Sequence, residues 1–546
     1  MSAAWPLNTA WMISCSVEAG RFGWACRHAA DAQARLLLQT VQANRHTEFG
    51  EAHSFDRIRS VRDYQERVPL ALYDDFAPAV QRIADGVKNI LTAEPVTLLE
   101  PTSGTTSGEK LIPYTAGLRR QFQRGVAAWI ANLFWHRPAL RDGRAYWSIS
   151  PALGPVRRSP GGIPIGFSDD AAYLGTLEQF AVRRVLAVPG AVARISDLTA
   201  FRYATLRFLL AAGDLTLISV WNPTFLTALL RPLPEWFDRL CADIRDGSLL
   251  PPAPLDAPIA AALAPYLRPD PRRADELVST QGSLAAIWPR LRLVSCWTDA
   301  AAGQFVPDVA RLLPGVEIQP KGLLATEGFV SLPLVGEHGA ALALRSHFFE
   351  FLESAGSRAR LAHELEVGGR YRVVLTTAGG LYRYKLHDEI EVVGRRRQCP
   401  LLRFVGKADL ASDLVGEKLA EPHVRSVVEG LALSATFALL VPVTGAPPRY
   451  RLYVQGDGIA EVEAAARLQA GLEENPYYRH AVAMGQLSPA EVCVLDPQGE
   501  SAWSVFERRK LALGQKCGAI KPAALDPWPG WPAEFAPSVT ARGVLK

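Results

Sequence analysis

Residues 98–113 read LLEPTSGTTSGEKLIP, and this stretch decides the fold class more than any other part of the chain. A β-prone run is followed at once by residues 102–110, most of which are glycine or carry a hydroxyl group. Such a loop lets backbone N–H and side-chain O–H groups surround phosphate oxygens. The spacing is not that of a Walker P-loop, because three residues separate Gly104 from Gly108 and Glu109 precedes Lys110. We therefore predict a phosphate-binding loop of another type; the alternative is a polar turn without a ligand.

The rest of the chain alternates between helical and β-prone segments. Residues 28–45 are rich in good helix formers, and short β-prone runs occur at residues 96–99, 146–149, 215–221, 291–297 and 371–375. This alternation predicts an α/β fold with largely buried sheets. The Pro- and Ala-rich residues 250–271 are interpreted as a loop with a short helix, the alternative being a linker.

A second, smaller α/β unit is predicted after residue 405. Residues 421–431 and 459–472 read as helices, and residues 438–442, 449–454 and 491–495 read as strands. We therefore predict a large N-terminal domain over residues 1–405 and a small C-terminal domain over residues 406–546, with a hinge near residues 406–418.

Composition excludes several classes of protein. The 546 residues contain 59 lysines and arginines against 55 acidic residues, a surplus too small for a nucleic-acid binder that neutralises phosphates. The seven cysteines are scattered without CxxC spacing, so neither a zinc site nor a disulfide framework is indicated. The N-terminus lacks a signal-peptide pattern, and no uncharged run reads as a membrane span. We expect a cytoplasmic enzyme that binds neither nucleic acid nor membrane.

The loop resembles the first signature of the adenylate-forming ligases, and four further segments narrow this resemblance to the GH3 acyl-acid amido synthetases. In chain order they are residues 63–86 (DYQERVPLALYDDFAPAVQRIADG), 321–328 (KGLLATEG), 381–392 (LYRYKLHDEIEV) and 404–421 (FVGKADLASDLVGEKLAE). The resemblance implies a large N-terminal adenylate-forming domain and a mobile C-terminal domain. It also implies ATP and Mg²⁺ as cofactors, with a small carboxylic acid and an amino acid or other amine as substrates.

The resemblance also implies roles for individual residues. The phosphate donors would be Ser103, Gly104, Thr105 and Thr106, with Lys110 as a cation at the end of the loop. Glu327 would hold Mg²⁺ with Thr326 beside it, and Asp388 would accept hydrogen bonds from the ribose. Lys407 and Lys418 would contact the nucleotide. The alternatives are a surface lysine for Lys110, an ordinary charged turn for Glu327 and, for Asp388, a salt bridge, since Arg383 is close in sequence.

Three positions depart from the family pattern. Leu323 replaces an aromatic residue that often covers adenine, and His387 replaces the usual glycine before Asp388. Lys407 replaces an arginine, so a bidentate contact becomes a single one.

The catalytic lysine of the family has two candidates in residues 513–523 (LGQKCGAIKPA). Spacing from Gly514 and the following Pro522 favour Lys521, with Lys516 as the second choice. We predict that this ammonium bridges the acid and the α-phosphate. Substrate contacts are predicted at Tyr146, Trp221 and Phe225, with a plain core role as the alternative.

Two other functions remain open at this point. An acyl-CoA ligase would share the adenylation step and pass the acyl group to a thiol, and a catalytically silent nucleotide-binding protein would release no pyrophosphate. The sequence leaves open the identity of the acid, the acceptor and the oligomeric state.

Overall fold

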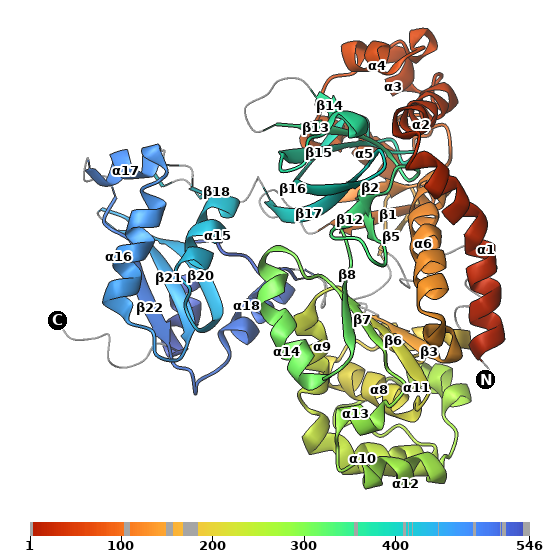
Figure 1. The fold of residues 1–546 in the computed structure, drawn as a ribbon, viewed down its shortest axis with the longest axis vertical. Coiled ribbons are helices and arrows are strands. Elements are labelled where there is room, and N and C mark those ends of the chain that lie inside the picture. Colours follow the sequence, from red (N-terminus) through yellow and green to blue (C-terminus); the bar gives the residue numbers. More distant parts are fainter. Residues whose placement is uncertain are drawn as a thin grey trace.

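A computed structural model describes residues 4–102, 110–148, 157–166, 184–353, 359–407, 411–412, 414–415, 417, 419–445, 447–483, 487–513, 515 and 520–538. Figure 1 shows three lobes: one around the long strands β15–β17, one around β3 and β6–β8 below it, and the C-terminal lobe to one side. The α/β class predicted from the sequence is confirmed by this mixture of sheets and helices.

The N-terminal helices cover the side of the molecule opposite the C-terminal lobe (Figure 1). They are α1 (Ala4–Ala25), α2 (Ala29–Ala43), α3 (Glu48–Ala52), α4 (Val61–Arg67), α5 (Tyr73–Ala84) and α6 (Ala116–His136). Helix α2 matches the predicted helix over residues 28–45. Helix α1 was not predicted; it packs along α6 through buried residues such as Trp11, whose ring lies 5.8 Å from that of Phe134.

The lower lobe contains a four-stranded sheet in the order β3-β6-β7-β8. The strands are β3 (Arg144–Trp147), β6 (Leu215–Ser219), β7 (Leu293–Cys296) and β8 (Glu317–Pro320), and all neighbouring pairs are parallel. Connecting helices are α8 (Leu198–Ala211), α9 (Pro223–Leu230), α10 (Leu233–Asp246), α11 (Ala257–Leu263), α12 (Pro271–Ser279), α13 (Leu284–Ile287) and α14 (Val306–Leu312). Because α11 lies inside residues 250–271, the prediction of a loop with a short helix there is confirmed.

The upper lobe contains a seven-stranded sheet in the order β11-β12-β17-β16-β15-β13-β14, antiparallel throughout. Its strands are β11 (Ser331–Pro333), β12 (Ala340–Leu342), β13 (Phe348–Leu352), β14 (Ala359–Leu361), β15 (Arg370–Thr376), β16 (Tyr384–Arg396) and β17 (Cys399–Lys407). A second sheet has the order β2-β1-β5-β4, with β1 (Leu98–Thr102), β2 (Lys110–Tyr114), β4 (Arg157–Arg158) and β5 (Pro164–Ile165). The N-terminal helices and these sheets share one hydrophobic core.

The C-terminal lobe follows the predicted pattern closely. A hairpin of β20 (Ala435–Val443) and β21 (Arg449–Gly456) is joined through α16 (Glu461–Leu472) and α17 (Pro476–Ala483) to β22 (Glu491–Leu495), which lies parallel to β21. Helices α15 (Glu421–Gly430), α18 (Ala502–Ala512) and α19 (Trp531–Phe535) complete the lobe, with the short strands β18 (Ala411–Ser412) and β19 (Leu419–Ala420) before it.

The described part of the chain contains no helix with the length and apolar character needed to cross a bilayer.

Candidate functional site

The predicted phosphate loop joins two antiparallel strands. Thr102 pairs with Lys110 across β1 and β2, so the loop begins and ends at the same point of the sheet. Ser103, Gly104, Thr105 and Thr106 lie outside the described residues. At the end of the loop the Lys110 ammonium lies 5.6 Å from the centre of the Tyr73 ring. This cation–π contact helps to hold the lysine side chain in position.

Thr326 and Glu327 form the two-residue turn between β9 (Leu324–Ala325) and β10 (Gly328–Phe329). The turn is held from two sides: the Tyr114 hydroxyl donates to the Thr326 carbonyl at 2.6 Å, and the Tyr384 hydroxyl donates to Glu327 Oε1 at 3.3 Å. The Glu327 residue is only 8% exposed. Burial and the Glu327 carboxylate raise the pKa of Tyr384, so this hydroxyl keeps its proton and remains a donor.

A buried histidine, His347, also holds the β9–β10 hairpin in place. The Phe329 backbone N–H donates to His347 Nε2 at 2.9 Å, and His347 Nδ1 lies 3.0 Å from Gln121 Oε1. Because Nε2 accepts, we assign the ring proton to Nδ1, which donates to the glutamine. Complete burial lowers the pKa of His347 to about 3, so the ring stays neutral and this arrangement persists at ordinary pH.

Asp388 lies on β16, 3% exposed, at the position opposite Lys407 on β17. The preceding residue, His387, has φ +62°, the left-handed conformation that favours glycine. A left-handed conformation at this position explains why the family pattern has glycine there. This chain has the same conformation with a histidine in place of glycine. Asp388 follows Tyr384 by four residues on β16, and its charge adds to the effects of burial and of Glu327 that raise the pKa of Tyr384. We call these three residues the carboxylate cluster.

Arg383 does not bind Asp388, the salt-bridge alternative considered from the sequence. Its guanidinium makes two bonds of 2.9 Å to the carboxylate of Glu350, and a third guanidinium nitrogen donates to the Val68 carbonyl at 2.7 Å. Both members of the ion pair are buried. The pair therefore ties the chain just after α4 to the seven-stranded sheet, which gives Glu350 a structural role.

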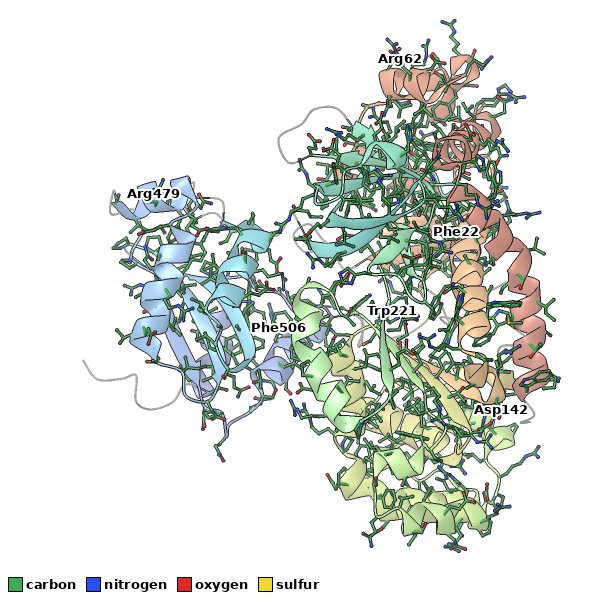
Figure 2. All side chains as sticks on the ribbon, in the orientation of Figure 1. Phe22, Arg62, Asp142, Trp221, Arg479 and Phe506 are labelled. Atoms are coloured by element: carbon green, nitrogen blue, oxygen red, sulfur yellow. The ribbon has the colours of Figure 1, made fainter. Side chains whose placement is uncertain are left out.

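A second group of side chains lies at the carboxyl edge of the parallel sheet. Trp297 and Lys321 directly follow β7 and β8, and Trp221 lies two residues after the end of β6. The carboxyl ends of parallel strands are the usual ligand-binding edge of α/β sheets. The two indole rings are 5.7 Å apart, and the Lys321 ammonium lies 5.1 Å from the Trp221 ring. We call these three residues the tryptophan edge. Figure 2 labels Trp221 near the middle of the molecule, where the lobes meet.

Lys521 reaches this edge from the C-terminal segment. Its ammonium lies 4.6 Å from the centre of the Trp297 ring and 5.4 Å from that of Phe404 on β17. The preceding residue is tethered, because Asn222 Nδ2 donates to the Ile520 carbonyl at 2.5 Å. Phe404 is three residues before Lys407, the strand partner of Asp388, so Lys521 contacts the strand that leads to the carboxylate cluster. Lys516 and Lys418 lie outside the described residues.

The predicted acid-site aromatics separate into two kinds. Tyr146 and Phe225 are buried in the core of the parallel-sheet lobe, which favours the plain core role. Trp221 is partly exposed and belongs to the tryptophan edge. Leu323, which stands where the family often has an aromatic residue over adenine, is also a core residue.

Sequence reasoning assigned no role to Lys321, Trp297 or Asn222. The signal for Trp297 and Asn222 was their position at or just after the end of a β-prone run, whereas no predicted run preceded Lys321. A search of the described residues finds no group of three His, Cys, Asp or Glu side chains that could hold a metal by themselves.

Comparison with known proteins identifies the family. The model of the GH3 family N-terminal domain matches residues 19–318, and that of the GH3 family central domain matches residues 340–407. Since the first match alone spans more than half of the chain, this protein belongs to the GH3 family, and the resemblance predicted from the sequence is confirmed.

Individual relatives agree along most of the chain. Indole-3-acetic acid-amido synthetase GH3.8 of Oryza sativa subsp. indica is 25% identical over 517 residues, which are 85% of this chain and 83% of the relative. The probable indole-3-acetic acid-amido synthetase GH3.1 of Arabidopsis thaliana is 25% identical, over 86% and 85% of the two chains. Among solved structures, AtGH3.15 acyl acid amido synthetase in complex with 2,4-DB has a TM-score of 0.84 at 19% identity, covering 97% of this chain and 96% of that one. This likeness shows that the two share a fold.

Proposed function

We propose that the protein is an ATP-dependent acyl-acid amido synthetase. The observation that carries the proposal is the position of Lys521, which contacts both the tryptophan edge, through Trp297, and β17, which pairs with the Asp388 strand. An ammonium that contacts both an aromatic surface and the strand paired with that of Asp388 suits a reaction that brings an apolar acid to a nucleotide. The names of the relatives, amido synthetases of indole-3-acetic acid, support the same reaction.

The reaction has two steps. In the first, an oxygen of the substrate carboxylate bonds to the α-phosphorus of ATP, and the bond to the leaving pyrophosphate breaks. In the second, the amine nitrogen bonds to the acyl carbon, AMP leaves and the amine loses a proton. Two anions must approach in the first step only, so a cation matters most there. Lys521 is the residue we assign to this task.

The carboxylate cluster has the chemistry to hold the nucleotide and its metal. Glu327 presents a carboxylate, the ligand type Mg²⁺ prefers, and the Tyr384 hydroxyl fixes it in place. When bound, Mg²⁺ would neutralise charge on the triphosphate. The buried Asp388 would accept hydrogen bonds from ribose hydroxyls, while Thr326 and Lys110 would border the phosphates. Ser103, Gly104, Thr105, Thr106, Lys407 and Lys418 remain predicted nucleotide contacts; for Tyr146 and Phe225 the predicted substrate contact stands against the core role that their burial favours.

We also propose the cytoplasm as the compartment. Among the described residues, Cys15, Cys26, Cys241, Cys296, Cys399 and Cys493 form no disulfide, as in proteins kept in a reducing environment.

Acid-dependent pyrophosphate release across a carboxylic-acid panel tests the proposed function. Each acid is supplied with ATP, Mg²⁺ and either a mixture of amino acids or coenzyme A, and products are separated by mass. We expect an amide with at least one acid. Thioester without amide would make the protein an acyl-CoA ligase, and the absence of pyrophosphate with every acid would leave only nucleotide binding.

Replacing Lys521 tests its assigned task within that reaction. Lys521→Ala should nearly abolish pyrophosphate release, while a supplied acyl-adenylate is still converted to amide, because a neutral amine needs the cation much less. The exposed Lys88→Ala serves as the matched control and should leave both steps unchanged. Equal loss in both steps would make Lys521 structural, and loss in neither would direct attention to Lys516.

A further inference from the structure

The parallel sheet presents two successive rows of side chains on one face. Ser219, Ser295 and Gln319 are aligned in register across β6, β7 and β8. Trp221 and Lys321 lie two residues beyond the first and last of these, and side chains two residues apart share a face of a strand. The outer row therefore consists of the tryptophan edge, with a polar row immediately beneath it.

Lys321 is anchored within this arrangement. Its ammonium lies 2.5 Å from Ser219 Oγ in the row below and 5.7 Å from the centre of the Trp129 ring on α6. Trp129 is itself fixed, since its Nε1 donates to Gln319 Oε1 at 3.1 Å. The lysine is 9% exposed, so its charge is held in a site of low polarity, where an ionic contact is stronger than in water.

The indole pair gives the site an apolar aromatic surface. Trp221 and Trp297 are both partly exposed, with ring planes inclined at 40°. Aromatic rings pack favourably when their centres are about 4.5–7 Å apart, beyond what burial of their area alone provides. The Lys321 ammonium contacts the Trp221 ring, and the Lys521 ammonium contacts the Trp297 ring. An aromatic group on this surface would therefore have an ammonium at each end of the pair.

We propose that Lys321 binds the carboxylate of the acyl substrate, and that this substrate is an aromatic carboxylic acid whose ring lies against Trp221 and Trp297. This inference rests on the proposed function. It adds the class of the substrate and the residue that selects for the negative charge of the substrate carboxylate. The two lysines then have different roles. Lys321, in the N-terminal part, binds the carboxylate of the acid before the reaction, and Lys521, in the C-terminal segment, stabilises the approach of that carboxylate to the α-phosphate. A charge-assisted hydrogen bond to the ammonium makes the site prefer a carboxylate over its neutral amide.

Calorimetric titration with indole-3-acetate and with indole-3-acetamide, in the absence of ATP, isolates the contribution of charge. The two probes share the ring and differ in the carboxylate. We expect the wild-type protein to bind the acid at least about tenfold more tightly than the amide, about 1.4 kcal/mol. Lys321→Met, which keeps a long apolar side chain, should bring the ratio to within about twofold, and Lys321→Arg should preserve a clear preference for the acid. A merely structural lysine would weaken both probes equally, so an unchanged ratio in Lys321→Met overturns the proposal.

The aromatic part of the proposal has its own matched pair. Phenylacetate and its saturated counterpart cyclohexylacetate are compared as substrates by pyrophosphate release. We expect phenylacetate to have the higher kcat/KM, and Trp221→Leu to remove most of the difference. Equal use of both acids by the wild type overturns the aromatic class while leaving the proposed function intact. If neither these nor any other acid in the panel releases pyrophosphate, it is the proposed function that fails.

Discussion

The parallel sheet and the antiparallel region of the N-terminal part position their candidate residues in different ways. In the parallel sheet, Trp221, Trp297 and Lys321 reach one edge simply because every strand ends there. In the antiparallel region, Glu327 and Asp388 depend on local irregularities: a two-residue turn and a left-handed residue beside a bulge. Topology gathers the first set, whereas individual backbone conformations place the second. Mutations in the antiparallel region should therefore affect the site through the backbone as well as through lost side chains.

The largest effect is expected in the loop between β1 and β2. Replacing Ser103 and Thr105 together by alanine should slow adenylation by orders of magnitude, because each lost donor to a developing anion typically costs about 2.7–4 kcal/mol. ATP–pyrophosphate exchange with a substrate acid measures this step. Ser279→Ala, which removes an exposed hydroxyl on α12, provides the control. Exchange at the wild-type rate in the double variant would remove the loop from the mechanism.

The Glu350–Arg383 ion pair should give the next largest effect, on stability. Glu350→Ala leaves a buried guanidinium without its carboxylate, a change that typically costs about 3–5 kcal/mol. Denaturant titration measures the loss in the free energy of unfolding. The matched control is Glu391→Ala, which breaks a pair with the half-exposed Arg403 and should cost at most about 1 kcal/mol. Similar losses in both variants would mean that the buried pair is not a special support of the sheet.

His347 should make stability depend on pH. Its folded pKa of about 3 lies below the unfolded value of 6.5, so the unfolded chain binds the extra proton between these values. The stabilisation from the neutral ring is therefore complete above pH 6.5 and is lost as the pH falls toward 3. By linkage the loss reaches about 2 kcal/mol at pH 5. His347→Gln cannot titrate, so its free energy of unfolding should fall less than that of the wild type between pH 7 and pH 5; parallel curves would contradict the assignment.

Sequence patterns predicted the parts of the fold whose signals are local. Three strands of the parallel sheet, β3, β6 and β7, and the βαβ unit of the C-terminal lobe appear as β-prone runs between helical ones and occur where predicted, whereas β8 was not predicted. The seven-stranded order could not be read in this way, since β12 pairs with β17 across more than fifty residues and no local pattern encodes such a pairing. The boundary near residue 405 remains a prediction. For the same reason the partnership of Glu350 with Arg383 was missed.

The site shows the same division. The family motifs pointed to Glu327 and Asp388; the structure joins Glu327 to Tyr384 by a hydrogen bond and places Asp388 four residues after Tyr384 on β16. Lys321 stood inside a quoted motif without a role, because its contacts are with Ser219 and Trp129, which come from distant parts of the chain. Its position at the carboxyl end of a strand was the one local clue.

The smallest effect concerns the left-handed residue beside Asp388, and it tests directly whether backbone conformation places the carboxylate cluster. A Cβ atom in the left-handed region costs about 1–2 kcal/mol, so His387→Gly should be more stable than His387→Ala by about 1 kcal/mol, as measured by denaturant titration. Comparing these two variants cancels the loss of the imidazole, which both lack. Lys385, on the same strand with φ outside the positive range, is the matched control position: there alanine should be the more stable replacement, because glycine loses more conformational freedom on folding. If alanine is also the more stable residue at position 387, the strand does not hold the left-handed conformation in solution. The position of Asp388 would then have to be explained by packing against Tyr384 and β17 rather than by the bulge.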